Sequence, residues 1–368
     1  MKRNNFGAII ISAGYSSRMG DFKPLLKFGK YTAVELLINT FTSSGINNIV
    51  VVVGHRGNEI LELLKNSKIK CVENRDYPKG MYSSIVTALG DLDDTVDGFF
   101  MIPVDIPLVK TNTINSLENE YLKGNAGIIY PVFNEKKGHP PLIDCKYKNI
   151  IKKWSGGGGL KKLLAKFEKD STMVAVCDNS ILMDMDTKDE YCKLVDYFNS
   201  QIPNIEECLC ILKLYNVPLD VIEHSVKVSQ VAMDICESLN DAGYNFDKNI
   251  LKTAGLLHDV SRNCKNHAEA GGKLLKKLGY PKLGNIISHH MNIKVSSQEN
   301  IKESEILYLS DKLVKKDKII NLKARREYCL NKYRDNQEAL YKINLRFDAA
   351  EDIMEKLKCA IGRVFKYE

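Results

Sequence analysis

The chain has 368 residues, of which 44% are hydrophobic and 27% charged, and its net charge is +7. This length predicts two domains, and this composition is that of a globular protein, which excludes disordered, collagen-like and coiled-coil chains. No apolar run reaches the roughly 18 residues of a membrane helix, and the basic residues are not clustered, so we expect no membrane and no nucleic acid as partner. The start lacks a signal-peptide cleavage site, and ten cysteines without a CxxC motif suit a reducing compartment, which predicts a cytoplasmic protein.

The first 200 residues alternate between strand-like and helix-like patterns. Continuous apolar runs predict five buried strands, at residues 6–14, 47–55, 97–107, 125–132 and 171–178. The intervening segments have helical periodicity. This alternation predicts a Rossmann-like α/β domain, with a mostly parallel sheet and helices on both faces.

The second part of the sequence has helical periodicity and no convincing strand. We expect a first domain at residues 1–200, a linker at residues 201–204 and an all-α domain at residues 205–368. The amphipathic tail has two interpretations: helices that pack on the second domain, or an exposed surface for a partner. Exposure of its apolar residues would favour the surface, in particular of Leu340, Ile343, Phe347 and Ile353.

A glycine-rich segment follows the first predicted strand, from Ser12 to Gly20, and Lys23 comes shortly after it. Open α/β sheets bind ligands at the carboxyl ends of their strands. Gly14, Ser16 and Ser17 keep backbone N–H groups accessible to phosphate oxygens, while Arg18 and Lys23 can neutralise a triphosphate. Since this is neither a Walker A loop nor a GxGxxG motif, a structural turn is the alternative.

The whole segment resembles the signature LAAGxSxRMGxxK of MobA-like nucleotidyltransferases, although Ser12 departs from the usual alanine or leucine. Asn74–Leu89, Gly138-His139-Pro140 and Ile181–Tyr191 resemble elements of the molybdenum cofactor cytidylyltransferase branch. The resemblance covers about residues 6–198. It implies transfer of CMP from CTP to the phosphate of a molybdopterin-type cofactor, with release of pyrophosphate. The implied nucleotide-binding residues are Ser12, Ala13, Gly14, Ser16, Ser17, Arg18 and Lys23.

The resemblance also assigns the magnesium site. Asp105, between two prolines at the end of a strand, matches the family's magnesium-binding aspartate, and Mg²⁺ prefers oxygen ligands and bridges phosphates. Asp184 or Asp186 would complete the metal shell; alternatively, either caps the helix that begins near Thr187. Arg18, Lys23 and Asp105 are the expected catalytic residues, because charge neutralisation dominates such transfers.

The choice of base and acceptor is less specific. Guanylyl-transferring relatives carry two glycines where this chain has Ala13-Gly14, and the methyl group of Ala13 leaves less room for a purine, which favours CTP over GTP. Gly138 and His139 are the expected acceptor contacts, with a packed loop histidine as the alternative for His139. The family's later glycine-aspartate element is represented by Gly156–Gly159 without its aspartate, so that acceptor contact stays open.

Five of the seven histidines fall between residues 224 and 290, and one of them precedes an aspartate. Imidazoles and carboxylates in this number suit one or two divalent metal ions. The spacing H…HD…H…HH…D resembles the HD phosphohydrolase superfamily over about residues 215–315. By that resemblance one metal is held by His224, His258, Asp259 and Asp311, and a second by His267, His289 and His290, with Asp259 bridging and catalytic. Manganese and iron both fit.

Two details of this second site stay open. Adjacent residues on a helix point about 100° apart, so the sequence does not decide whether His289 or His290 binds directly. The lysine that often follows the HD element is absent. Arg262 stands nearby, either as a phosphate ligand or as a surface arginine.

Two functions therefore compete for the chain. The first is a molybdenum cofactor cytidylyltransferase fused to a metal-dependent phosphohydrolase, with a molybdoenzyme as a possible client of the tail. The second is a nucleotidyltransferase acting on a sugar phosphate or another phosphorylated alcohol, with an HD domain that hydrolyses or senses a nucleotide.

Overall fold

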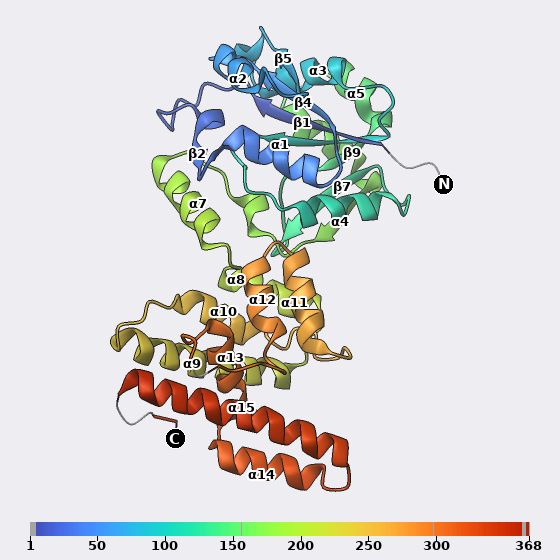
Figure 1. The fold of residues 1–368 in the computed structure, drawn as a ribbon. Helices are drawn as coiled ribbons and strands as arrows, with labels where there is room; N and C mark the ends of the chain where they lie inside the picture. Colours follow the sequence, from blue (N-terminus) through green and yellow to red (C-terminus); the bar gives the residue numbers. More distant parts are fainter. Residues whose placement is uncertain (1–4, 156, 297, 363–365, 368) are drawn as a thin grey trace. The chain divides into compact units, whose positions relative to one another are not determined.

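The computed structural model describes residues 5–155, 157–296, 298–362 and 366–367. The chain forms two compact units, one ending at Ser200 and the other beginning at Gln201 (Figure 1). Within the described residues, no helix has the length and apolar character required to cross a bilayer. All ten cysteines lie in the described part of the chain, and none forms a disulfide.

The first unit is built on an eight-stranded sheet with the order β10-β7-β9-β6-β1-β4-β5, and β8 pairs with β7. Parallel pairing joins β1 to β4 and β6, β4 to β5, and β10 to β7, whereas β9 runs antiparallel to both of its neighbours. The mostly parallel sheet is therefore confirmed. Its strands are β1 (Phe6–Ser12), β4 (Asn48–Val53), β5 (Lys70–Glu73), β6 (Gly98–Pro103), β7 (Ile128–Phe133), β8 (Lys136–Lys137), β9 (Leu142–Asp144) and β10 (Ser171–Ala175).

Helices cover both faces of this sheet (Figure 1), which explains why its central strands β1, β4 and β6 are almost entirely apolar. Alternate residues of β6 point to opposite faces. Phe99 and Met101 pack with Ile85 of α3, while the ring of Phe100 lies 5.7 Å from that of Phe41 in α1. The helices are α1 (Ala33–Ser43), α2 (Gly57–Leu64), α3 (Met81–Asp91), α4 (Thr111–Tyr121), α5 (Lys148–Lys153), α6 (Gly159–Leu164) and α7 (Lys188–Ser200).

Short elements complete the first unit around the ends of the strands. A two-stranded ribbon joins β2 (Lys27–Phe28) to β3 (Tyr31–Thr32), and Thr32 and Glu35 form a capping box that fixes the start of α1. The 3₁₀ helices are η1 (Lys23–Leu25), η2 (Tyr77–Lys79), η3 (Cys145–Tyr147), η4 (Ala165–Asp170) and η5 (Asn179–Leu182).

The second unit is helical, as expected, except for one small hairpin. The prediction of no strand after residue 204 is wrong at β11 (Val314–Lys315) and β12 (Lys318–Ile319), which pair antiparallel. Two residues per strand are too few to produce an alternating pattern that the sequence could reveal. The helices are α8 (Ile205–Leu214), α9 (Leu219–Asp241), α10 (Lys248–Leu257), α11 (His267–Lys277), α12 (Pro281–Ser288), α13 (Glu303–Lys312), α14 (Leu322–Lys332) and α15 (Gln337–Ile361).

Close helix crossings bring the histidine-bearing segments together. A Cβ atom on Gly255 of α10 would lie 2.4 Å from the Cα atom of Ser229 in α9. A Cβ atom on Gly272 of α11 would lie 2.6 Å from the carbonyl oxygen of Gly284 in α12. Larger residues at these two glycines would push apart the helices that flank the metal-ligand candidates.

The tail forms α14 and α15, and α15 contacts α9 and α13. Ile343, Phe347 and Ile353 are buried, and Leu340 is half-buried. This burial favours the interpretation of the tail as helices that pack on their own unit, and the apolar residues proposed for a docking surface are used in that packing.

Candidate functional site

The nucleotide candidates surround a cavity of about 250 Å³ at the carboxyl ends of β1 and β6. The loop after β1 forms one wall, and the loop before α3 and the segment after β6 form the others. Of the residues expected to bind nucleotide or magnesium, those that line the cavity are Ser12, Ala13, Gly14, Ser16, Lys23 and Asp105. Ser17 and Arg18 are exposed and do not line it.

The loop after β1 is held open by a turn at Ser16. Ser16 has a positive φ of 55°, and its carbonyl oxygen accepts hydrogen bonds from the backbone N–H groups of Met19 and Gly20. Its hydroxyl oxygen accepts one from the N–H group of Lys23 at 3.2 Å. These bonds tie the turn to the lysine and leave Gly14 exposed beside the cavity, which suits a backbone that has to approach phosphate closely.

Lys23 links the two acidic segments that the sequence assigns to magnesium. Its ammonium group lies 2.5 Å from Asp186 Oδ1 and 3.4 Å from Asp105 Oδ2, and its side chain is only 11% exposed. The guanidinium group of Arg18 donates to Asp186 Oδ2 at 2.7 Å. The hydrogen bond from Lys23 lowers the pKa of Asp186, whereas burial and the nearby charges of Asp186 and Asp105 raise the pKa of Asp184.

The negative charges of Asp105 and Asp186 near Asp184 are a reason for a further cation to bind at this place. Neither Asp184 nor Asp186 caps α7, because Thr187 and Glu190 form a capping box at its start. This excludes the alternative interpretation of the two aspartates as helix caps. Their oxygens and those of Asp105 are not gathered as tightly as in the second unit, which holds the two three-residue groups with metal-ligand spacing found among the described residues.

A second cavity of about 500 Å³ lies next to the first, and Met81 lines both. Gly138 and His139, the expected acceptor contacts, line this second cavity. Gly158 and Gly159 of the glycine run line it too, while Gly156 of that run lies outside the described residues.

Close packing explains why the Gly138-His139 segment has this form. A Cβ atom on Gly138 would lie 2.6 Å from both a side-chain carbon and the carbonyl oxygen of Ile181. The N–H group of His139 donates to that same carbonyl oxygen at 3.0 Å. Nδ1 of His139 is buried without a hydrogen-bond partner among the described residues, and burial lowers the pKa of its imidazole. His139 is therefore a neutral ring at the cavity wall.

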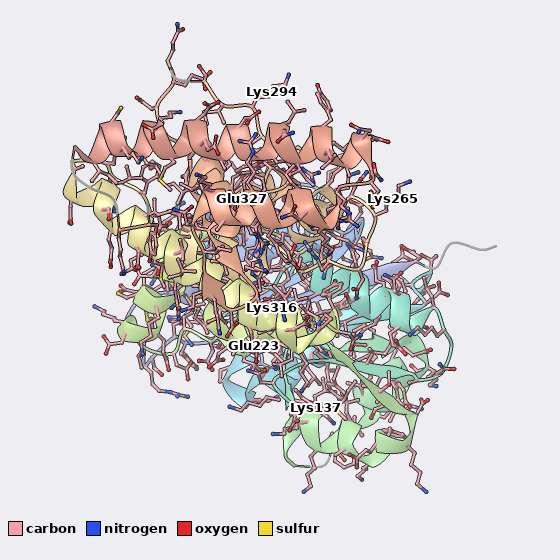
Figure 2. The ribbon with its side chains drawn as sticks, turned by 90° about the horizontal axis from the view of Figure 1, so that it is seen from below. Lys137, Glu223, Lys265, Lys294, Lys316 and Glu327 are labelled. Carbon is pink, nitrogen blue, oxygen red and sulfur yellow. The ribbon has the colours of Figure 1, made fainter. Side chains whose placement is uncertain are left out.

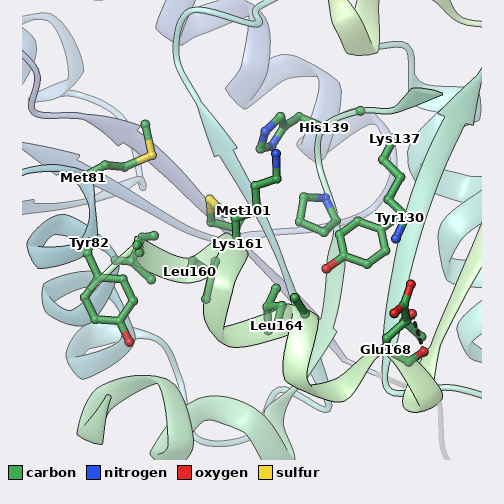
Figure 3. Close-up of a pocket in the computed structure, with 17 residues that line it drawn as sticks. Met81, Tyr82, Met101, Tyr130, Lys137, His139, Leu160, Lys161, Leu164 and Glu168 are labelled. Carbon is green, nitrogen blue, oxygen red and sulfur yellow. Dashed lines mark hydrogen bonds between the residues drawn. The ribbon is translucent and has the colours of Figure 1, made fainter. Parts of the chain in front are cut away.

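The rest of this cavity was not anticipated from the sequence. Tyr82 stands on one side, and Tyr130, Lys137 and Glu168 stand on the other (Figure 3). The ammonium group of Lys137 lies 4.7 Å from the centre of the Tyr130 ring. Lys161, at the start of α6, adds a second cation. Tyr82 falls within the Asn74–Leu89 element, but the others belong to no motif, and only the folded chain brings residues from these separate elements together.

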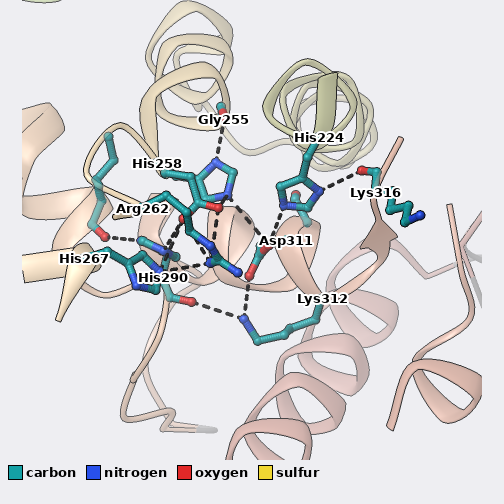
Figure 4. A network of polar contacts seen from close by, with 12 residues as sticks. His224, Gly255, His258, Arg262, His267, His290, Asp311, Lys312 and Lys316 are labelled. Carbon is teal, nitrogen blue, oxygen red and sulfur yellow. Dashed lines mark hydrogen bonds and ion pairs between the residues drawn. The ribbon is translucent and has the colours of Figure 1, made fainter. Parts of the chain in front are cut away.

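The second unit gathers most of its metal-ligand candidates into one cluster (Figure 4). His224 comes from α9 and Asp311 from α13, and the others follow or begin helices: His258, Asp259, His267 and His290. Ligand atoms of His224, His258 and Asp259 lie within 4.8 Å of one another, and so do those of Asp259, His267 and His290. Asp259, which is 3% exposed, belongs to both groups.

Backbone carbonyls orient three of these imidazoles. Nδ1–H of His258 donates to Gly255, that of His290 to Ile287 and that of His224 to Lys316, each at 2.8 Å. A carbonyl oxygen can only accept, so each Nδ1 carries a proton, and in the neutral ring the lone pair of Nε2 faces the cluster.

The cluster fits divalent metal ions because buried ring nitrogens in it lack hydrogen-bond partners within the described part of the chain, and its histidines are able to bind a metal. Nε2 of His258 and Nε2 of His290 are buried without hydrogen-bond partners among the described residues. Nε2 of His224 faces Asp311 Oδ1 at 3.0 Å, so two acceptors meet unless a proton or a metal ion lies between them. Burial lowers the pKa of His267 to about 4 and also lowers that of His290, which keeps both rings neutral and able to bind a metal.

His289 is not part of this cluster, and its expected role as a metal ligand is not supported. It is exposed, whereas His290 is 0% exposed. Both follow the last turn of α12, where the roughly 100° between successive side chains turns only one of them inward.

Two basic residues contact the cluster. Arg262, which is half-exposed, lies 3.3 Å from Asp259 Oδ2 and donates to Nε2 of His267 at 3.2 Å. The ammonium group of Lys312 lies 2.6 Å from Asp311 Oδ2 and 3.3 Å from the carbonyl oxygen of His290. Burial alone would raise the pKa of Asp311, but Lys312 and the hydrogen bond with His224 hold it well below its usual range. Sequence reasoning missed Lys312, since a lysine inside a helix gives no sign of being buried.

Comparisons with known proteins separate the same two parts. Residues 8–172 match the model of the MobA-like NTP transferase domain, and residues 221–315 match that of the HD domain. The molybdenum cofactor cytidylyltransferase of Escherichia coli K12 is 30% identical over 186 residues, which are 50% of this chain and 92% of that protein.

A further relative and a solved structure are also similar to part of the chain. The bifunctional IPC transferase and DIPP synthase of Rubrobacter xylanophilus is 37% identical over 93 residues, and the match spans 24% of this chain and 21% of that protein. A solved nucleotidyl transferase from Methanothermobacter thermautotroptrophicus is 18% identical, with a TM-score of 0.47, over 54% of this chain and 100% of that chain.

Proposed function

Because the chain belongs to the MobA-like NTP transferase family and also carries an HD domain, we propose that it transfers CMP from CTP to the phosphate of a molybdopterin-type cofactor. Its second unit is proposed to be a metal-dependent phosphohydrolase. The observation that carries the first part is the pair of adjoining cavities that meet at Met81. One holds the phosphate loop, Lys23 and Asp105, and the other holds Gly138 and His139.

The nucleotide cavity has the charges that nucleotidyl transfer requires. Lys23 contacts both Asp105 and Asp186, and Arg18 contacts Asp186. These two cations are the groups that would pair with the triphosphate of the nucleotide. Asp105, Asp184 and Asp186 would hold Mg²⁺, which would neutralise the charge that develops on the leaving pyrophosphate. The acceptor phosphate forms a bond to the α-phosphorus as the bond to pyrophosphate breaks.

The acceptor cavity supports a flat, phosphorylated acceptor. Tyr82 and Tyr130 offer aromatic surface for a pterin, Lys137 and Lys161 offer charge for its phosphate, and Glu168 can accept hydrogen bonds from ring N–H groups. A sugar phosphate would use the lysines but would leave both aromatic rings without a planar partner.

The base preference rests on Ala13. Ala13 is 2% exposed and is one of the residues that line the nucleotide cavity, and its methyl group fills space in which a glycine would leave room for the loop to shift. The smaller pyrimidine of CTP is therefore the proposed base.

The second unit is proposed to hydrolyse phosphoesters or phosphoanhydrides. His224, His258, Asp259 and Asp311 would hold one metal ion, and Asp259, His267 and His290 a second. Such ions, when bound, activate water and neutralise a leaving oxygen. The chain's own contribution is to fix the three imidazoles through their backbone carbonyls and to keep the ligands buried.

The test of the transferase is direct chromatographic detection of the dinucleotide. The full chain is incubated with Mg²⁺, molybdopterin and CTP, GTP or ATP, and Asp105→Ala is compared with Asp196→Ala. Asp196 is exposed on α7 and lines neither cavity, which makes it a matched control.

We expect CTP to give the dinucleotide with the wild type and the control and not with Asp105→Ala. Formation of a dinucleotide from a sugar phosphate and not from molybdopterin would replace the acceptor assignment. No product from any pair, in folded protein, would refute the proposed transfer.

A further inference from the structure

A separate pocket of about 450 Å³ opens onto the metal-ligand cluster of the second unit. His224 and Asp259 form its floor, and Arg262 stands beside them. The rest of its lining comes from the start of α9, from the turn between β11 and β12, and from α14. Those remaining residues are Asp220, Val221, Glu223, Lys316, Asp317 and Arg325.

Three cations from three separate segments line this pocket: Arg262 after α10, Lys316 in the hairpin turn and Arg325 in α14. Lys316 and Arg325 have no side-chain ion pair or hydrogen bond with any described residue. The carbonyl oxygen of Lys316 accepts the hydrogen bond from His224, which ties the hairpin turn to the edge of the cluster (Figure 4). Such cations beside a metal-ligand cluster suit an anionic ligand.

The same pocket offers no platform for a nucleobase. Among its described lining residues there is no Phe, Tyr or Trp; the one ring is the imidazole of His224, a metal-ligand candidate, and Val221 is the single aliphatic side chain. Protein sites for bases ordinarily use stacking on aromatic or apolar surface. This lining therefore favours a compact polar anion over a nucleotide.

Three carboxylates share the opening: Asp220, Glu223 and Asp317. Figure 2 labels Glu223 together with Lys316. Carboxylates in such a place oppose a bare polyanion but suit one that carries its own divalent cation. Pyrophosphate complexed with Mg²⁺ has both properties, since its phosphates suit the cations and its metal suits the acids.

We propose that this pocket binds inorganic pyrophosphate and that the second unit hydrolyses it, an inference that rests on the proposed phosphohydrolase. A water oxygen forms a bond to one phosphorus, the bridging P–O bond breaks, and the bridging oxygen leaves with the second phosphate. One water proton passes to that phosphate, and two orthophosphates result without any change of oxidation state. Arg325 and Lys316 hold the phosphate that lies away from the cluster.

With this assignment, the reaction of the second unit follows that of the first. Nucleotidyl transfer releases one pyrophosphate per turnover, and the transfer is close to reversible because one phosphoanhydride replaces another. Hydrolysis of the released pyrophosphate draws the transfer forward. The class of reaction that supplies the substrate is therefore the one proposed for the same chain.

The first test measures binding and needs no turnover. Methylenediphosphonate, a pyrophosphate analogue that cannot be hydrolysed, is titrated calorimetrically into Mn²⁺-loaded full chain with Mg²⁺ present. Arg325→Ala is compared with Lys323→Ala, which removes a cation from the same helix at an exposed position that does not line the pocket.

We expect Arg325→Ala to weaken binding by about 10- to 100-fold, the loss typical of one hydrogen bond to a charged group, and Lys323→Ala to leave it unchanged. Equal affinities in the two variants, or tighter binding of CMP or O-phosphoethanolamine than of the analogue, would overturn the proposal.

A hydrolysis assay then distinguishes the pyrophosphate assignment from the proposed phosphohydrolase function on which it rests. Phosphate release from pyrophosphate and from p-nitrophenyl phosphate is measured with the same Mn²⁺-loaded protein. Cleavage of pyrophosphate, with a raised KM in Arg325→Ala, is the expected result. Cleavage of the phosphomonoester alone refutes the pyrophosphate assignment and keeps the phosphohydrolase. Cleavage of neither, in protein that binds Mn²⁺, refutes both.

Discussion

Replacement of Lys312 by methionine tests whether Asp311 binds a metal ion, because the resulting loss of stability should then depend on whether metal is present. The ammonium group of Lys312 lies 2.6 Å from Asp311 Oδ2, and the two side chains are 9% and 14% exposed. Removing one partner of a buried ion pair leaves the other charge uncompensated, at a cost of roughly 3–5 kcal/mol. Methionine keeps the length and the apolar contacts of the lysine stem.

The size of the effect depends on what else neutralises Asp311. Without metal, the ion pairs that Asp311 keeps in the variant, among the described residues, are those with His224 and His258. With a metal ion bound, its charge is neutralised again. In a unit of this size each kcal/mol shifts Tm by about 2–4 °C, so we expect a loss of roughly 6–20 °C without metal. We expect less than half of that loss with Mn²⁺.

Thermal unfolding of wild type and Lys312→Met, each in EDTA and in Mn²⁺, measures the four values needed. The wild type should gain less from Mn²⁺ than the variant does. An equal loss of Tm in both conditions would show that Lys312 acts by packing alone and that Asp311 does not bind the metal.

Three further predictions concern separate positions. Ala13→Gly should raise kcat/KM for GTP relative to CTP by about 10-fold or more, since one methyl group in a tight site is worth about that much; an unchanged ratio in steady-state assays would remove Ala13 from base selection. His290→Ala should lose bound Mn²⁺ as measured by elemental analysis, and His289→Ala should retain it; equal loss would contradict the separation of the two histidines. Burial raises the pKa of Glu118 to about 7 from a value of 4.5 in the unfolded chain, so stability present below pH 4.5 is lost as pH rises through 7. Glu118→Gln should therefore raise the free energy of unfolding at pH 8, by at most about 3 kcal/mol, and leave it unchanged at pH 4. Denaturant unfolding at both pH values measures the difference. The same gain at both pH values would contradict a raised pKa of Glu118.

The fold could be predicted where burial of a segment requires a recognisable pattern of apolar residues. The runs in β1, β4 and β6 are apolar at nearly every position because helices cover both faces of the sheet, and their short length favours strands over helices. The hairpin of β11 and β12 has two residues in each strand and leaves no comparable mark.

The candidate sites likewise contain some residues that the sequence could predict and others that it could not. Residues with a fixed spacing, such as Ser12 to Lys23 and His258-Asp259, could be identified because phosphate binding and metal binding demand particular residue types close together. Which of His289 and His290 faces the cluster depends on how α12 ends, and no neighbouring residue in the sequence predicts that ending. Tyr82, Tyr130 and Glu168 meet only through tertiary structure, so nothing local marks them as lining one cavity.

The central claim, two independent chemistries in one chain, is tested most directly by phosphorus NMR of one reaction containing CTP, molybdopterin and Mg²⁺, with Asp105→Ala and Asp259→Ala run in parallel. The wild type should convert CTP to a dinucleotide with a new diphosphate signal. Asp259→Ala should form the same product, and Asp105→Ala should not. Loss of the dinucleotide in folded Asp259→Ala, or CTP left intact by the wild type, would contradict the account.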